Sequence, residues 1–415
     1  MSSLASKVTQ GFSAFSTLPR PVYLLSIALL LMRSAEHFYV PILPLYVRVL
    51  DASIPMFLVG LVVGIHRLGM VIANPIAGSW CDRIGFRKPF LIGVVITSAA
   101  SALGGAALGA ADLTLYRILS GIGYGTLTMA AMGFINSVTT PQNRATAMSL
   151  LSASTLAGAA LGPFPGGYIA ESLASVLSGY RWTFFSGGLV QILVGVAAFF
   201  LIRDRAAIAR RMPLAAKGLS LYTLALRHKN VSVTALSIFL FGLSHGAFLY
   251  FTVPLLGESL GFGPVRIGWI ISGFGFGHVL GALIMGPLSD KAGKRKPFLF
   301  LALLWPGILI LLFSLVDTVA PMVAITFVYG FVTAPCCGIL PALAAELLPE
   351  APTSSIALQN SAEMLGIFVG PIIGGLILSA FGFSVALVTY GVITIAGSLI
   401  FQLSVPEPGR VSNQG

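Results

Sequence analysis

The residues that could do chemistry in this sequence are ionisable side chains set within long apolar runs. Arg33, Glu36 and His37 follow one another at i, i+3 and i+4, so a helix would present them on one face. Charges at membrane depth are costly and are kept mainly for function. Burial and a neighbouring cation shift a carboxyl pKa in opposite directions, which suits a carboxylate to proton exchange. We therefore expect Glu36 to carry a proton.

Other polar groups within apolar runs extend this candidate site. Arg117 lies at nearly the same depth as Glu36, counted at about 1.5 Å of helix rise per residue. We expect these two residues to interact, directly or through His37. The alternative is a static buried ion pair that only holds two helices together. The remaining candidates for proton coupling or substrate binding are Arg67, His245, Asn360 and Glu363.

The composition identifies the elements that must position these residues. The chain has 415 residues, of which 56% are hydrophobic and 9% charged, whereas soluble proteins carry roughly 25% charged residues. A membrane-spanning helix needs about 20 mostly apolar residues. Twelve such runs are expected, at 21–47, 55–81, 89–110, 113–137, 146–170, 182–202, 231–256, 266–289, 297–316, 321–346, 355–381 and 384–404. The fold class is therefore an all-α polytopic membrane protein.

The twelve runs form two repeats. A charged stretch beginning at Gly78 returns at Gly286, and a glycine-rich stretch beginning at Gly158 returns at Gly366, both after 208 residues. Two unrelated motifs in one register indicate a tandem duplication. His37 and His245 share this offset. We expect an N-terminal six-helix bundle at 1–202, a cytoplasmic linker at 203–230 and a C-terminal six-helix bundle at 231–415.

The basic residues of the connecting segments set the expected orientation. With the N-terminus inside, 18 Lys and Arg residues fall on the cytoplasmic side and 3 on the opposite side. Under the positive-inside rule both termini are cytoplasmic. The net charge of +11 is thus a topology signal, and we expect no nucleic-acid partner. Because Gly121, Gly123 and Gly125 lie within a span and follow no strand, they form no nucleotide-binding loop. We expect no cofactor and no metal.

The charged stretch resembles the loop motif of the major facilitator superfamily between spans 2 and 3. The motif residues are Gly78, Asp82, Arg83, Gly85, Arg87 and Lys88, echoed in the second repeat by Gly286 and Asp290. The stretch from Leu115 to Gly125, with Arg117, looks like the family's span-4 motif. The glycine-rich stretch resembles the span-5 motif of the drug:proton antiporter branch. Its residues are Gly158, Gly162, Pro163, Gly166 and Gly167, with Gly366, Gly370, Pro371 and Gly374 in the second repeat.

The resemblance implies roles for these motifs. The loop aspartate would hold one conformation, with Asp82 at the N-terminus of span 11, where a helix dipole attracts an anion; we call this a conformational latch. The glycine stripe would form a seam between spans of opposite halves, span 5 against span 8, since small residues allow close helix contact in membranes. Span 2 would lie beside span 11. This would place Arg67 near Glu363 as a gate pair, a pocket pair or a bundle-stabilising pair.

We therefore expect a secondary active transporter that works by alternating access around a midplane site. The expected reaction is proton-coupled antiport that exports a small organic molecule or drug. The alternative is an organic-anion transporter or proton symporter that uses the membrane arginines, Arg33 above all, as counter-ions. No catalytic constellation indicates an enzyme. The expected partners are the substrate, protons and membrane lipids, for a monomer in a bacterial inner membrane.

Overall fold

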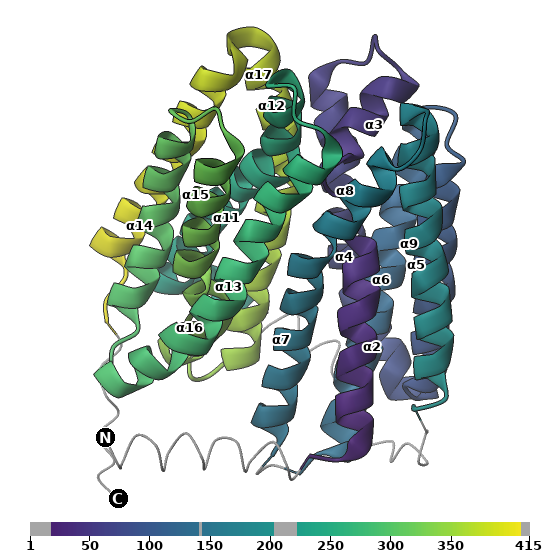
Figure 1. Ribbon diagram of the computed structural model, residues 1–415. Coiled ribbons are helices and arrows are strands. Elements are labelled where there is room, and N and C mark those ends of the chain that lie inside the picture. The colour runs from purple at the N-terminus through teal and green to yellow at the C-terminus, as the bar shows by residue number, and fades with distance from the viewer. Residues whose placement is uncertain (1–17, 141–142, 203–221, 408–415) are drawn as a thin grey trace, which may run out of the picture. The chain divides into compact units, whose positions relative to one another are not determined.

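The apolar runs form helices because backbone groups inside a membrane must be hydrogen-bonded within their own segment. In the computed structural model, residues 18–140, 143–202 and 222–407 are described, and no strand occurs among them (Figure 1). The expected all-α fold is confirmed. The first repeat comprises α2 (Arg20–Glu36), α3 (Leu43–Leu50), α4 (Met56–Ile84), α5 (Arg87–Gly105), α6 (Ala110–Val138), α7 (Arg144–Leu161), α8 (Pro163–Glu171) and α9 (Val176–Phe199).

The second repeat follows the linker, whose residues 203–221 lie outside the described part, and its helices break at partly different places. It comprises α11 (Lys229–His245), the π-helix η1 (Gly246–Thr252), α12 (Val253–Ser259), α13 (Pro264–Ala292), α14 (Lys296–Phe313), α15 (Val319–Thr333), α16 (Pro335–Leu347) and α17 (Pro352–Ser404). Helix α17 holds two expected spans, which turn at Gly382. Ten helices in the described part are long and apolar enough to cross a membrane.

Several expected spans are broken where the sequence suggested continuous helices. The first is divided between α2 and α3, and residues 37–42 between them form turns. The fifth breaks at Gly162, because Pro163 starts α8 and cannot continue the hydrogen-bond ladder of α7. The seventh passes through the seven-residue π-helix η1. Such π segments are rare and occur often at functional sites.

The chain divides into two units. One comprises Met1–Val40 and Gly69–Arg211, and the other Pro41–Leu68 and Met212–Gly415. Residues 41–68, which the sequence assigns to the first bundle, group with the second unit, and the expected bundle boundaries stay a prediction. The physical reason is the close packing of α4 on α17. A side chain in place of Gly60 or Gly64 would meet the backbone of Pro371 or Phe368.

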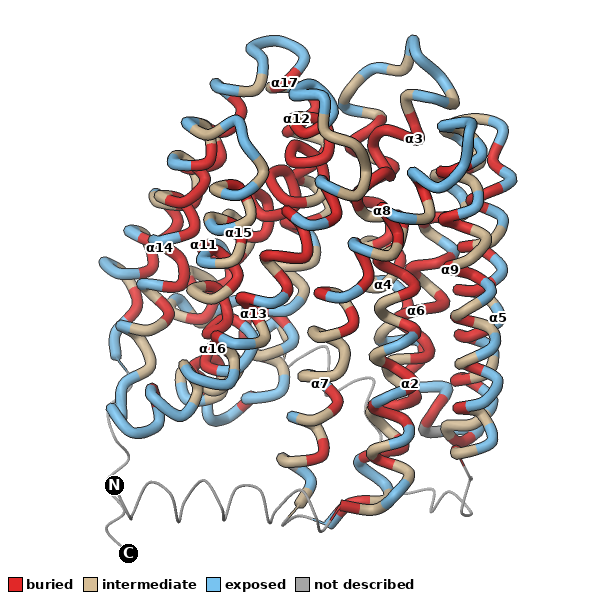
Figure 2. Tube along the Cα trace, viewed as in Figure 1, coloured by how far each residue is buried: buried red, intermediate tan, exposed pale blue. Residues whose placement is uncertain are grey.

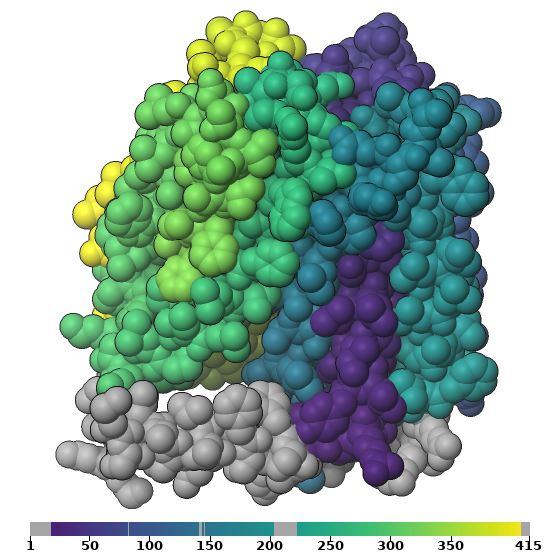
Figure 3. All heavy atoms as spheres, in the orientation of Figure 1, coloured from purple at the N-terminus to yellow at the C-terminus, as the bar shows by residue number. Residues whose placement is uncertain are grey.

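Each unit has its own apolar core. In the first, buried side chains of α2, α5, α6 and α7 pack around Phe90, Tyr124 and Phe134. In the second, α11, α14, α16 and α17 pack around Phe241, Leu303 and Phe401. Figure 2 shows the buried faces as red stretches that alternate with exposed turns along each helix. In the space-filling view, atoms of neighbouring helices within a unit meet across the visible face (Figure 3).

Candidate functional site

The first predicted group of ionisable residues lies at the C-terminal end of α2. Arg33 donates from Nη1 to Glu36 Oε2 at 2.5 Å. His37 caps the helix, and its Nδ1 lies 3.0 Å from the carbonyl oxygen of Arg33. Glu36 and His37 are buried, at 3% and 5% exposure. A helix C-terminus attracts cations, so the break at residue 37 helps to hold Arg33 beside the carboxylate.

Two arginines of the first unit are stacked on tyrosines. The guanidinium of Arg33 lies 4.8 Å from the ring centroid of Tyr124, and that of Arg117 lies 4.8 Å from the centroid of Tyr39. Glu36 is paired with Arg33, one turn away on the same helix, and its predicted interaction with Arg117, direct or through His37, stays a prediction.

The duplicated histidines mark the same break in each repeat. Helix α11 ends at His245, as α2 ends one residue before His37, and η1 follows directly. His245 is 5% exposed, and its Nδ1 lies 3.1 Å from the hydroxyl of Tyr329. Its ring stacks on Phe241 and Tyr329, each with centroids 5.7 Å away. The 208-residue offset therefore corresponds to an equivalent structural position, although the two surroundings differ in chemistry.

A ring cluster surrounds His245 in the second unit. Tyr250 of η1 meets His245 edge-on at 5.3 Å, and Phe274 of α13 lies at 5.0 Å. His245 and Tyr329 are buried, whereas Tyr250 and Phe274 keep part of their surface exposed. Sequence reasoning missed Tyr250, Phe274 and Tyr329, because aromatic side chains in membrane spans give no signal that separates a site from a core.

Arg67 of α4 lies beside this ring cluster. Its guanidinium is 5.8 Å from the centroid of Tyr250, and Nη1 lies 4.0 Å from the sulfur of Met364. Arg67 is also within electrostatic range of the Glu363 carboxylate. Within the described residues the two form no ion pair, since none with a nitrogen–oxygen distance of 4.0 Å or less joins them. Arg67 and Glu363 therefore lie in the same region of the unit. Asn360, another predicted residue, is exposed one turn before Glu363.

A histidine–cysteine pair lies next to Glu363. His278 of α13 is hydrogen-bonded through Nδ1 to Thr333 at 3.2 Å and through Nε2 to Cys337 at 3.2 Å. Cys337 is exposed, while the adjacent Cys336 is buried. Both thiols are within electrostatic range of Glu363. No three metal-ligating side chains come together anywhere in the described residues.

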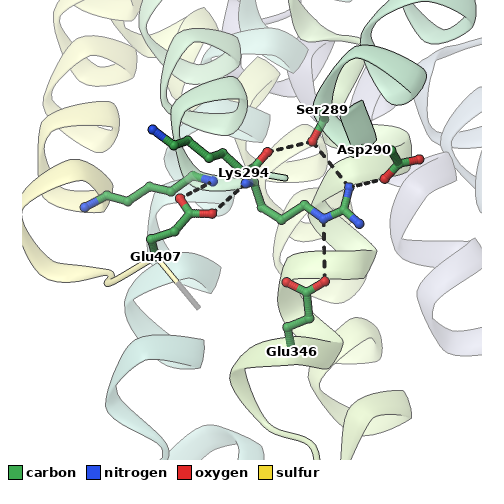
Figure 4. Close-up of polar contacts among 7 residues, drawn as sticks. Ser289, Asp290, Lys294, Glu346 and Glu407 are labelled. Carbon is green, nitrogen blue, oxygen red and sulfur yellow. Dashed lines mark hydrogen bonds and ion pairs between the residues drawn. The ribbon is translucent and has the colours of Figure 1, made fainter. Parts of the chain in front are cut away.

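The second charged loop holds its aspartate locally. Asp290 accepts from Arg295 Nη1 at 2.5 Å, and Arg295 Nε lies 3.5 Å from Glu346 at the end of α16 (Figure 4). The hydrogen bond that Arg295 donates to Asp290 and the charges of both acids hold the pKa of Arg295 above its ordinary value, against partial burial. Glu407 accepts from the backbone N–H groups of Arg295 and Lys296 at 2.6 and 2.9 Å. This carboxylate caps α14.

The first charged loop is described less fully. The side chain of Asp82 lies outside the described residues, so its predicted contact with span 11 stays a prediction. The motif glycines Gly85 and Gly293 both adopt positive φ, at 84° and 64°. This left-handed conformation ends the helix and favours glycine. The motif spacing thus has a backbone cause in both repeats.

The glycine stripe packs against the first helix of its own repeat, and the predicted seam with span 8 stays a prediction. A side chain at Gly158, Gly162 or Gly166 would meet the backbone of α2 and the turn that follows it, at Leu30, Ser34 and Phe38. In the second repeat, Gly366 and Gly370 lie in the same way against Phe239 and Leu243 of α11. Spans 5 and 11 therefore use their small residues to approach the first helix of their own repeat. The spacing of the glycines shows that one face of the helix is smooth, but it does not identify the helix that packs against that face.

Comparisons with known proteins give the family context. The family described as Major Facilitator Superfamily matches residues 25–263 and 234–414. Multidrug resistance protein 2 of Bacillus subtilis is 26% identical over 347 residues, covering 81% of this chain and 84% of that protein. The multi-drug resistance efflux pump PmrA of Streptococcus pneumoniae is 27% identical over 354 residues, covering 83% and 86%. The quinolone resistance protein NorA of Staphylococcus aureus is 24% identical over 347 residues, covering 81% and 84%.

Solved structures share the fold. A bacterial homolog of the human lysosomal transporter Spinster, inward-facing and unoccupied, has a TM-score of 0.77 at 17% identity. It covers 93% of this chain and 97% of its own. A D-xylose-proton symporter has a TM-score of 0.69 at 18% identity, with 93% and 99% coverage. At these identities the likeness concerns the fold alone.

Proposed function

The chain belongs to the major facilitator superfamily, and we propose that it exports a small organic molecule in exchange for protons by alternating access. Membership makes it a multi-pass membrane transporter rather than an enzyme. The drug-resistance names of its relatives support an exported organic substrate. We also propose that both termini are cytoplasmic, that the protein works as a monomer, and that it resides in a bacterial inner membrane.

The observation that carries proton coupling is the Arg33–Glu36 pair at the broken end of α2. A carboxylate buried in a membrane span is retained there because the 2.5 Å contact with Arg33 offsets the loss of hydration. If Arg33 moves away, the same burial favours the neutral acid, and Glu36 takes up a proton. His37, bonded to the carbonyl of Arg33, couples the helix break to this pair. The conformational change would thereby set proton affinity.

The test is transport by purified protein in liposomes with a pH gradient. In Glu36→Gln we expect gradient-driven efflux to fall at least about tenfold, while substrate exchange without a gradient continues. Glu171→Gln, an exposed acid at the end of α8, is the control and should match the wild type. Full gradient-driven transport by Glu36→Gln would contradict proton coupling through this residue.

One observation favours the organic-anion alternative. Arg117 is buried, and its Nε and Nη1 lack a hydrogen-bond partner in the described residues. An anionic substrate or co-ion would supply that partner. Arg33, expected to serve as the counter-ion, is instead bonded to Glu36. If the protein carries anions, Arg117→Gln should lose transport of a carboxylate substrate and keep its affinity for cations. If it exports cations, Arg117→Gln should show no such difference between carboxylate substrates and cations.

A further inference from the structure

We propose that His245 donates a hydrogen bond from Nε2 to the substrate, so that the ring cluster forms a subsite for a flat aromatic ring that carries a carbonyl oxygen. The proposal rests on the proposed export function and adds the class of substrate and the group that selects it. The ring cluster comprises His245 and the four rings around it, those of Phe241, Tyr250, Phe274 and Tyr329, all in the second unit.

One nitrogen of the His245 imidazole is open although the residue as a whole is buried. His245 is 5% exposed, and its Nδ1 lies 3.1 Å from the hydroxyl of Tyr329. Nε2 makes no hydrogen bond within the described residues, and it is not among the unbonded polar atoms that are fully buried. Buried polar groups of proteins are normally hydrogen-bonded. An open ring nitrogen between closely packed aromatic rings therefore points to a ligand.

Tyr329 determines which nitrogen of His245 carries the hydrogen. Tyr329 is fully buried, at 0% exposure. Nδ1 of His245 is the sole hydrogen-bond partner of its hydroxyl in the part of the chain that the structure describes. The hydroxyl hydrogen is therefore satisfied only if Tyr329 donates and Nδ1 accepts. Since a neutral imidazole then bears its hydrogen on the other nitrogen, Nε2 is a donor and requires an acceptor on the substrate.

The π-helix η1 brings Tyr250 onto the same side of the span as His245. In an α-helix a residue five positions on lies about 140° around the axis. At the end of η1 the N–H of Val253 bonds to the carbonyl of Phe248, five residues back, and this wider turn returns the fifth residue toward the first. The Tyr250 ring thereby meets His245 edge-on, with centroids 5.3 Å apart. The π-helix therefore builds one wall of the subsite.

The partly exposed rings of the cluster give access to it. Tyr250 and Phe274 keep part of their surface exposed, whereas Phe241 and Tyr329 are buried. The guanidinium of Arg67 lies 5.8 Å from the centroid of Tyr250. A charged side chain at membrane depth faces the protein interior or a watery cavity, so the side of Tyr250 next to Arg67 faces the interior. Aromatic rings stack on one another, and the positive charge of Arg67 favours an electron-rich oxygen over a cation.

The experiment measures equilibrium binding to the purified full-length protein in detergent, without any pH gradient. The probes are fluorenone, which has a carbonyl oxygen on a flat aromatic frame, and fluorene, which has a methylene group in its place. The ratio of their affinities, from titration calorimetry, is compared between proteins, because partition into the detergent is the same for each. His245→Phe keeps a ring but removes the donor, and should lower the preference for fluorenone at least about fivefold.

Two further variants serve as matched comparisons. His245→Gln keeps an N–H donor and should retain part of the preference. His278→Phe should retain all of it, because both ring nitrogens of His278 are already bonded, to Thr333 and to Cys337. A measurement on the wild type alone is the infrared carbonyl stretch of bound fluorenone. Because a hydrogen bond weakens the carbonyl bond, the stretch should lie at lower frequency than in detergent without protein.

The outcomes separate this inference from the proposed function. Equal affinity ratios in the wild type and His245→Phe overturn the subsite. If His245→Phe is poorly folded, the infrared measurement decides the matter, and an unshifted carbonyl band overturns the subsite. Loss of gradient-driven transport in His245→Phe with the fluorenone preference intact would make His245 a proton carrier instead. Failure of the proposed function would appear as absent gradient-driven transport in the wild type, whatever these binding results show.

Discussion

Gly293 and Gly286 occupy the same charged loop region but differ in what their backbone requires. Gly293 has φ of 64°, ends α13 and bonds back to Ser289, a conformation that costs other residues about 1–2 kcal/mol. Gly286 is helical, and a side chain there would meet no atom within 4 Å. We predict that Gly293→Ala lowers stability by about 1 kcal/mol, whereas Gly286→Ala leaves it equal or higher, because alanine is the better helix former. Thermal unfolding in detergent measures both.

The same contrast exists in the first repeat and provides the control. Gly85 has φ of 84°, whereas a side chain at Gly78 would have only Met129 nearby, at 3.9 Å. If Gly85→Ala and Gly293→Ala both left the stability unchanged, the explanation of these glycines by their positive φ would be wrong. A transport defect in Gly78→Ala or Gly286→Ala at unchanged stability would instead point to a contact made in another conformation, as the latch proposal for Asp82 requires.

At the scale of elements, each repeat seats its glycine stripe on its own first helix. A leucine at Gly370 would overlap the backbone of Leu243 and force α17 away from α11. Overpacking of this kind costs typically about 1–3 kcal/mol, and here it opposes rigid backbone. We predict that Gly370→Leu sharply reduces the yield of monodisperse protein and its melting temperature. The matched control is Gly338→Leu on α16, where nothing lies within 4 Å; equal losses in both would refute this account.

Element-level reasoning from sequence succeeded where it depended on local physics. The apolar runs predicted the spans, and the 208-residue offset predicted which elements correspond, because both are properties of consecutive residues. It does not identify which helix packs against a smooth face. The stripe at Gly162 suits any close helix, and only the folded chain shows that Ser34 of α2 is the neighbour. The break after α2 did carry a signal that was overlooked, because Pro41 has no N–H to donate to the carbonyl of His37 and its ring crowds that carbonyl.

The candidate site shows the same limit. Arg33, Glu36 and His37 were predicted to share one face, and the helix brings them together. Arg67 and Glu363 lie 296 positions apart, and their proximity came from the family resemblance rather than from spacing. Contacts between side chains far apart in sequence depend on packing that composition does not encode.

At the scale of the whole molecule, residues 41–68 of the first repeat contact elements of the second repeat. They come from the first repeat but group with the second unit, through the packing of α4 on α17 and through an ion pair. Arg48 of α3 donates to Glu258 of α12 at 2.6 Å, at the ends of these helices remote from the charged loops. Both side chains are more than 40% exposed, so the pair adds little stability, about 0–1 kcal/mol, and can open readily.

Alternating access requires contacts of this kind to part during each cycle. We predict that an Arg48→Cys, Glu258→Cys variant, made after the native cysteines Cys81, Cys336 and Cys337 are replaced by alanine, loses transport on cross-linking and regains it on reduction. Each single-cysteine variant should transport before and after the same treatment, which controls for chemical damage. The measurement is substrate efflux from liposomes beside a gel assay of cross-linking. Undiminished efflux by fully cross-linked protein would mean that α3 and α12 move together, and the opening would then have to lie elsewhere on that face.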